Sequence, residues 1–195
     1  MQKILYLHGF ASAGSTGTAT ELRNHFYPLG VSVISPDIPV MPADAVPFLE
    51  QLVADEQPDL IAATSMGAMY AEQMKGYKRI LVNPSFQMSR NLTFNHLGKN
   101  VEFRNPRKDG ARQFKVDKEM IAQFKAIEKD RVLKGITPDE KKLVWGLFGL
   151  RDKFVNFQKE FQKAYGKEHF ATFDGEHYLN SQVLKKVVLP LIESI

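Results

Sequence analysis

The sequence contains no cysteine in its 195 residues, and this absence narrows the chemistry at once. Disulfide frameworks, thiolate metal sites, iron–sulfur clusters and cysteine nucleophiles are all excluded. Long apolar runs are missing as well, because no stretch of about 18 apolar residues that could cross a bilayer occurs. The start of the chain, Met1–Leu7, lacks the pattern of an export signal. We therefore expect a cytoplasmic protein without a membrane span.

Metal-binding motifs are scarce too. There is no HExxH pattern and no tight cluster of His and Asp, so we expect no metal and no cofactor. One stretch, Gly9–Thr16, nearly spells a phosphate-binding loop, but Ser15 stands where that loop needs its lysine. We interpret the run Gly14–Thr20 instead as a flexible loop at the rim of an active site.

Excess charge is absent from most of the chain. The net charge is +4, but residues 99–142 hold 13 basic and 8 acidic residues, whereas the remainder holds 13 basic and 14 acidic ones. The whole basic excess therefore belongs to one segment. A mass of 22.1 kDa fits a single domain with a sizeable core, which we place at residues 1–195.

Short apolar runs bounded by Gly, Pro, Asn or Asp recur along the chain and alternate with helical patterns. Most runs are continuous, which is typical of strands buried on both faces of a parallel sheet. The predicted strands are Ile4–Leu7, Val31–Ser35, Leu60–Thr64, Arg79–Val82, Leu143–Phe148 and His169–Phe173. The predicted helices are Thr20–Phe26, Asp44–Asp55, Met66–Met74, Lys153–Tyr165 and Ser181–Ile195. The pattern predicts an α/β fold with helices on both faces of the sheet.

The alternation stops between residues 86 and 139. This stretch shows no convincing strand and one helical pattern, Lys118–Leu133, so we interpret it as a helical lid or cap inserted into the domain. Aromatic residues interleaved with arginines, as in Phe103–Arg112, would also fit a nucleic-acid surface. A solvated basic lid is the commoner outcome, so we expect no nucleic-acid partner. Such a lid would also attract anionic acyl substrates.

The pentapeptide Ala63–Gly67 has the features of a nucleophile elbow. It follows a buried strand, opens a helix, and has small residues two before and two after Ser65. The sharp turn requires small neighbours and holds the serine in a strained conformation. The alternative is that Ser65 merely caps the helix.

A serine hydroxyl needs a base, and the base needs a carboxylate that holds it in place. Asp152 and His177 each follow a predicted strand, in the chain order Ser, Asp, His that this fold requires. The carboxyl ends of parallel strands meet at one edge of the sheet. Asp152 could instead cap a helix that begins at Lys153, and His177 could be an ordinary loop residue.

An acyl-transfer site also needs two backbone N–H groups for the oxyanion. Met66, which follows the serine, and Phe10, in the loop after the first strand, are the expected donors. His8 is expected to hold that loop through side-chain hydrogen bonds rather than to react. Candidate substrate-binding residues beside the predicted catalytic loops are Phe10, Ser85, Phe86 and Tyr178.

These residues make the sequence resemble the α/β-hydrolase superfamily, and more closely the small bacterial YqiA-type esterases. The motifs that carry the resemblance are Tyr6–Phe10, Ala63–Gly67, Val82–Pro84, Gly149–Asp152 and Gly175–His177. The resemblance covers the chain except residues 86–139. It implies a Ser65–His177–Asp152 triad and ester hydrolysis through an acyl-enzyme. It also implies a reduced fold of about six mostly parallel strands.

We therefore expect a serine hydrolase that acts on a small-molecule carboxylic ester or thioester. Two alternatives stay open. The chain could be a non-catalytic interaction protein that keeps the hydrolase fold, or an acyltransferase, lyase or peroxidase on the same fold. The sequence leaves the oligomeric state open.

Overall fold

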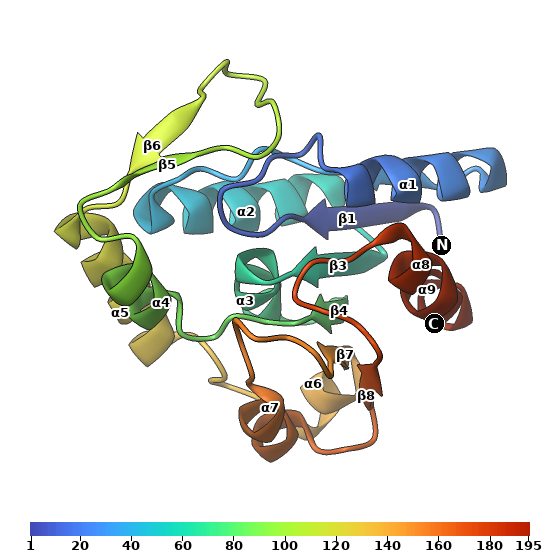
Figure 1. Cartoon of the computed structure of the whole chain (residues 1–195). Coiled ribbons are helices and arrows are strands. Elements are labelled where there is room, and N and C mark those ends of the chain that lie inside the picture. Colours follow the sequence, from blue (N-terminus) through green and yellow to red (C-terminus); the bar gives the residue numbers. More distant parts are fainter.

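The computed structural model describes all residues 1–195 and is built on one six-stranded sheet (Figure 1). The sheet has the strand order β2-β1-β3-β4-β7-β8, and every neighbouring pair is parallel. Its strands are β1 (Lys3–Leu7), β2 (Ser32–Ile34), β3 (Leu60–Thr64), β4 (Lys78–Val82), β7 (Val144–Gly149) and β8 (Phe170–Phe173). The prediction of about six mostly parallel strands is confirmed.

Helices cover both faces of this sheet. They are α1 (Gly17–Phe26), α2 (Pro42–Glu56), α3 (Met66–Glu72), α4 (Met88–Asn95), α5 (Lys118–Asp130), α6 (Pro138–Lys142), α7 (Gln158–Tyr165), α8 (Ser181–Val183) and α9 (Leu189–Ser194). A short 3-10 helix, Tyr27–Leu29, follows α1, and a π-helical turn, Leu184–Val188, joins α8 to α9.

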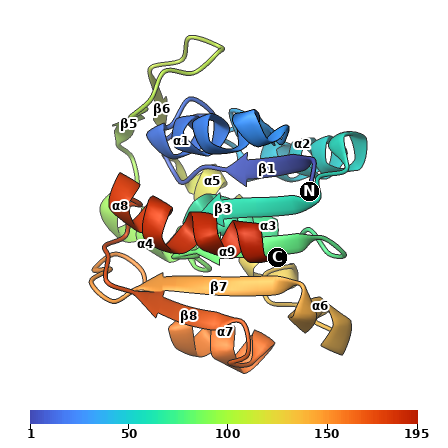
Figure 2. The ribbon, with the colours of Figure 1, turned by 90° about the vertical axis from the view of Figure 1, so that its right-hand side faces the viewer.

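The alternation of side chains along each strand divides the core in two. Leu5 and Leu7 pack with α2, α3, α5 and α7 in one hydrophobic cluster. Ile4 and Tyr6 pack with α1 and the C-terminal helices in the other, on the face that α9 covers in Figure 2. Both faces of the central strands are therefore buried, which explains their continuous apolar sequences.

The insertion differs from the prediction in two ways. It contains two strands, β5 (Asn100–Glu102) and β6 (Gln113–Lys115), which pair antiparallel as a small separate sheet. At three residues each, with exposed alternate positions, they are too short to produce a periodic signal. Helix α5 also packs into the core, because Phe124 is fully buried in the same cluster as the central strands.

Two smaller expectations were wrong. The helix predicted from Lys153 begins at Gln158, because the residues before it form an irregular loop at the end of β7. The run 14–20, predicted as a flexible loop at the rim of the active site, forms the first turn of α1 from Gly17 onward, although Thr16, Gly17 and Thr18 do line the cavity that contains Ser65. The Thr16 side chain caps that helix by accepting a hydrogen bond from the Ala19 amide at 3.2 Å.

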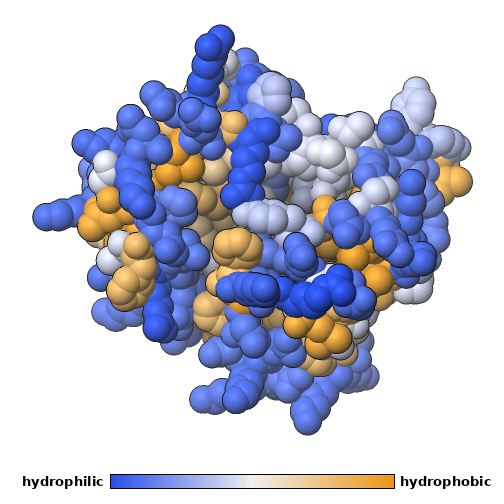
Figure 3. All heavy atoms as spheres, in the orientation of Figure 1, coloured by the Kyte–Doolittle hydropathy of each residue, from blue (hydrophilic) through white to orange (hydrophobic).

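Hydrophilic residues dominate the face of the molecule shown in Figure 3, with apolar residues in smaller groups between them. None of the helices has both the length and the apolar character needed to span a membrane. Nowhere in the chain do three or more His, Asp or Glu side chains converge in a way that could hold a metal ion.

Candidate active site

Ser65 lies in a strained turn between β3 and α3. Its φ is 53° and its ψ is −118°, a conformation that costs a non-glycine residue of order 1–3 kcal/mol. The turn exists because small residues surround it. A Cβ on Gly67 would lie 2.3 Å from the Leu7 carbonyl oxygen, and one on Gly9 would lie 3.3 Å from the Ser65 Cβ. The Ser65 side chain makes no capping bond to its helix, so the alternative capping role is contradicted.

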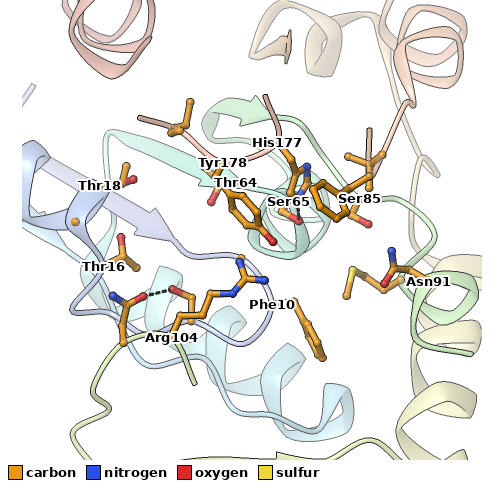
Figure 4. Close-up of a pocket in the computed structure, with 18 of the residues that line it drawn as sticks. Phe10, Thr16, Thr18, Thr64, Ser65, Ser85, Asn91, Arg104, His177 and Tyr178 are labelled. Carbon is orange, nitrogen blue, oxygen red and sulfur yellow. Dashed lines mark hydrogen bonds between the residues drawn. The ribbon is translucent and has the colours of Figure 1, made fainter. Parts of the chain in front are cut away.

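The structure brings the three predicted catalytic side chains into one hydrogen-bonded chain, of which Figure 4 shows Ser65 and His177. His177 Nε2 lies 3.0 Å from Ser65 Oγ, and His177 Nδ1 lies 2.7 Å from Asp152 Oδ2. Because an ionised carboxylate can only accept, Nδ1 donates to Asp152 and Nε2 is left to accept from the serine hydroxyl. The Asp152 and His177 side chains are 3% and 8% exposed, so bulk water barely competes for these bonds.

Asp152 also organises its own loop. Its Oδ1 accepts hydrogen bonds from the Phe154 and Val155 amides at 2.8 and 3.0 Å, while Oδ2 faces the histidine. The alternative interpretation, in which Asp152 caps a helix, is wrong: its carboxylate caps a turn that precedes α7, and the N-cap of α7 is Phe157. The same bonds fix the direction in which Oδ2 points.

Asn83 is a functional candidate to which the sequence analysis assigned no role. Its side-chain NH2 donates to the Glu176 and His177 carbonyls at 3.0 and 3.1 Å, and its Oδ1 accepts from the Gly149 amide at 2.7 Å. It thus ties together the two loops that carry Asp152 and His177. Asn83 is 2% exposed and has a φ of 45°, which asparagine tolerates better than most residues. The only signal was its place in the motif Val82–Pro84.

The loop after β1 lies against Ser65 and presents the predicted second oxyanion donor. Neither the Phe10 nor the Met66 backbone N–H takes part in the hydrogen bonds of the loops, turns and caps, so both remain candidate oxyanion donors. His8 holds this loop as expected. Its Nδ1 donates to the Gly9 carbonyl at 2.8 Å, and its Nε2 accepts from the Ile38 amide at 3.1 Å.

His8 is neutral in this position. Burial lowers its pKa to about 4, an effect that the bond to the Gly9 carbonyl opposes and the charge of Arg107 reinforces. A neutral ring carries one proton, which matches the one donor and one acceptor role that its nitrogens play.

Ser65 and His177 line a cavity of about 770 Å³. Three of the four predicted substrate-binding residues, Phe10, Ser85 and Tyr178, line it as well. The fourth, Phe86, does not. Its side chain is 3% exposed and packs against Phe157 at a ring distance of 5.7 Å, because it belongs to the hydrophobic core. The insertion supplies part of the cavity wall through Met88, Asn91, Asn95, His96, Arg104 and Asn105.

Comparison with known protein families gives a match over most of the chain. The family described as "Uncharacterised protein family (UPF0227)" matches residues 3–186. The chain belongs to this family. The match includes Ser65, Asp152 and His177, and also the insertion for which the sequence motifs offered no family resemblance.

Solved structures show that this UPF0227 chain has the α/β-hydrolase fold. It is similar to Est1E from Butyrivibrio proteoclasticus with bound ferulic acid, at 16% identity and a TM-score of 0.72 over 100% of this chain and 89% of that one. It is also similar to mouse alpha/beta hydrolase domain-containing protein 10, at 12% identity and a TM-score of 0.67 over 98% and 88%. A soluble variant of monoglyceride lipase from Saccharomyces cerevisiae matches at 13% identity and a TM-score of 0.66 over 99% and 85%.

Proposed function

We propose that this UPF0227 chain is a serine hydrolase that cleaves carboxylic esters or thioesters through an acyl-enzyme. Ser65 is the nucleophile, His177 the general base and acid, and Asp152 the residue that orients the histidine. The Phe10 and Met66 amides bind the oxyanion. The observation that carries the proposal is the hydrogen-bonded chain from Ser65 Oγ through His177 to Asp152, joined to a backbone strain at the serine.

Acylation begins when His177 Nε2 accepts the Ser65 proton as the hydroxyl oxygen attacks the substrate carbonyl carbon. The imidazolium that forms is stabilised by the Asp152 carboxylate. Negative charge develops on the carbonyl oxygen, where two amide donors and the N-terminus of α3 lower its energy. Collapse of the intermediate expels the alcohol or thiol, which takes its proton from His177.

Deacylation repeats these steps with water as the nucleophile. His177 accepts a water proton, the tetrahedral intermediate forms in the same oxyanion site, and Ser65 leaves with the proton returned to it. The cavity of about 770 Å³ is within the size range of small-molecule sites, and both reacting side chains face it.

Two features favour hydrolysis over the alternative of a non-catalytic protein that keeps the fold. A buried Ser–His–Asp chain has no structural need for a serine in a strained conformation, so strain at Ser65 points to function. Two of the similar structures are also a lipase in complex with a substrate analogue and a protein with bound ferulic acid. Both are said of those proteins and support the proposal by analogy of fold.

A fluorophosphonate probe separates the two candidates, because it reacts covalently only with an activated serine. We expect the native protein to be labelled at Ser65, and the Ser65→Ala variant to remain unlabelled. The Ser85→Ala variant is a matched control, since Ser85 lines the same cavity outside the triad. An unlabelled native protein would show that the hydrolase proposal is wrong and would favour the interaction protein.

A further inference from the structure

The cavity around Ser65 is unusual in its charge. No Asp or Glu side chain lines it, whereas Arg104 and Lys153 both do. Neither of these cations forms an ion pair or a side-chain hydrogen bond within the protein, whereas Arg107 and Arg131, two of the five arginines of the insertion, each pair with a carboxylate. Two uncompensated cations therefore face the space that the substrate would occupy.

The backbone around Arg104 is held in place by hydrogen bonds to the loop after β1. Its backbone amide donates to the Ala11 carbonyl at 2.9 Å, next to the proposed oxyanion donor Phe10. The next residue, Asn105, accepts a hydrogen bond from Ser12 at 2.9 Å. Asp37 then joins the two segments, because its carboxylate accepts from the Gly14 and Lys108 amides at 2.7 and 2.6 Å.

The Arg104 guanidinium itself is free to bind a ligand. It forms no hydrogen bond or ion pair within the protein and lies over the ring of Tyr178, whose centroid is 4.5 Å from Cζ. Figure 4 shows the side chain in the cavity between Tyr178 and Phe10. The stacked ring orients the planar fork without using any of its N–H donors, which is the arrangement that bidentate binding of a carboxylate or phosphate requires.

The neighbouring His96 supports this picture. It lines the same cavity, and its pKa is lowered by burial and then by the charges of Lys99 and Arg104. The positive potential of Arg104 thus extends into the cavity.

We propose that Arg104 and Lys153, which line the same cavity, form an anion subsite, so that the preferred esters carry a carboxylate or phosphate group. The inference deepens the proposed hydrolase function and rests on it. The two sources of negative charge can be told apart by placing the charge on different parts of the substrate.

The first experiment measures kcat/KM for two matched pairs of esters. One pair is the p-nitrophenyl monoester of a dicarboxylic acid and its methyl-capped neutral counterpart. The other pair has an alcohol that carries a phosphate monoester, compared with the same alcohol without it. We expect the native protein to prefer the charged member of at least one pair. Arg104→Gln should reduce that preference by about 10- to 100-fold, the worth of a charge-assisted hydrogen bond.

The Arg112→Gln variant is the matched control. Arg112 is an exposed arginine of the same insertion, and its removal changes the net charge equally, but it lies outside the cavity. It should leave the preference for charged esters intact. An equal loss in both variants would overturn the subsite, because it would mean general electrostatic attraction. No preference for either charged ester in the native protein would overturn it too.

A binding measurement separates failure of the subsite from failure of the hydrolase proposal. The probes are amide analogues of the two charged esters, in which the scissile ester is replaced by an amide. Calorimetry with the Ser65→Ala variant should detect binding of these probes. Adding Arg104→Gln should abolish or strongly weaken it. Binding that is unchanged by Arg104→Gln, or absent for both probes, overturns the subsite. Fluorophosphonate labelling of Ser65 decides the hydrolase proposal independently of that result.

Discussion

Each end of strand β4 carries a buried polar residue, and the two residues have very different hydrogen-bond partners. Arg79, near the amino end, is fully buried and binds the Glu72 and Tyr77 carbonyls and the Glu140 carboxylate. Asn83, just past the carboxyl end, binds the backbone of the loops that carry Asp152 and His177. One strand thus connects two polar networks, one at each end of its length.

The two networks contain similar polar groups but serve different purposes. At the amino end, Glu72 is fully enclosed and accepts hydrogen bonds from Lys75, Leu133 and Tyr165, so its oxygens face only the protein. At the carboxyl end, the chain of bonds from Asp152 through His177 ends on a serine that opens into a cavity. A buried carboxylate partner therefore indicates chemistry only where the network reaches accessible space.

The largest effect should come from breaking the carboxyl-end network at its reacting atoms. Ser65→Ala and His177→Ala should each lower kcat by about 10⁴-fold or more, because each removes a step on which the other depends. The double variant should be little worse than either single one. Steady-state kinetics on a p-nitrophenyl ester measures this. Losses that multiply would show that the two residues do not act as a unit.

Asp152→Asn sharpens the same test. An amide can donate to Nδ1 and so favours the wrong histidine tautomer, which lowers turnover by about 10⁴-fold in a comparable triad. A milder loss would mean that a nearby carboxylate such as Glu176 replaces it. Circular dichroism checks that each variant keeps the native fold.

The next largest effect should appear at the other end of β4 and in stability rather than activity. Arg79→Met leaves Glu140 and two carbonyls buried without their partner, a change that typically costs about 3–5 kcal/mol of unfolding free energy. Urea unfolding measures it. The folded fraction should still hydrolyse esters at the native kcat, because Arg79 has no contact with the cavity.

Two controls test that separation. Arg79→Met combined with Glu140→Leu should recover part of the lost stability, because it removes the unpaired charge. Lys142→Met breaks the exposed pair with Asp139 and should leave stability unchanged within error. A fall in kcat for Arg79→Met, measured per folded molecule, would contradict the division of labour between the two ends.

Asn83 tests whether the carboxyl-end residue acts by positioning. Asn83→Asp keeps an acceptor for the Gly149 amide but loses both donors to the loop of His177, and it keeps a residue that tolerates positive φ. We expect kcat to fall about 100-fold with KM little changed, since a small displacement of the base slows the chemical step. Fluorophosphonate labelling should slow in parallel. A purely structural residue would lower stability without this split.

Sequence predicted the parallel sheet and the three catalytic candidates because both depend on local patterns. Apolar runs mark buried strands, and Ser65, Asp152 and His177 each stand at a fixed place after such a run. Arg79 and Asn83 escaped because their role depends on partners about 60 to 90 residues away. Phe86 was misplaced for a related reason: adjacency to Ser85 in sequence says nothing about which side of the chain faces the core.

The same limit applies to the insertion. The three-residue strands β5 and β6 pair with each other, and the loop between them is held by hydrogen bonds to the loops after β1 and β2. No periodicity in the segment itself announces those contacts. Its basic composition, in contrast, was visible, and Arg104 gives that composition a place in the cavity.

The smallest predicted effect concerns His8, a second histidine at the carboxyl edge of the sheet, which is buried and has no proposed part in the reaction. The pKa of His8 is about 4 in the folded protein, below the value near 6.5 of an unfolded chain. The unfolded state therefore binds more protons between these values, so stability is complete above pH 6.5 and is lost as the pH falls toward 4. At pH 5 the loss should be about 2 kcal/mol. Urea unfolding at pH 7.5 and pH 5 measures it, with His8→Gln as control. Glutamine can still accept from the Ile38 amide but does not titrate, so its stability should fall less over this range, and an equal fall would assign the pH dependence to other groups.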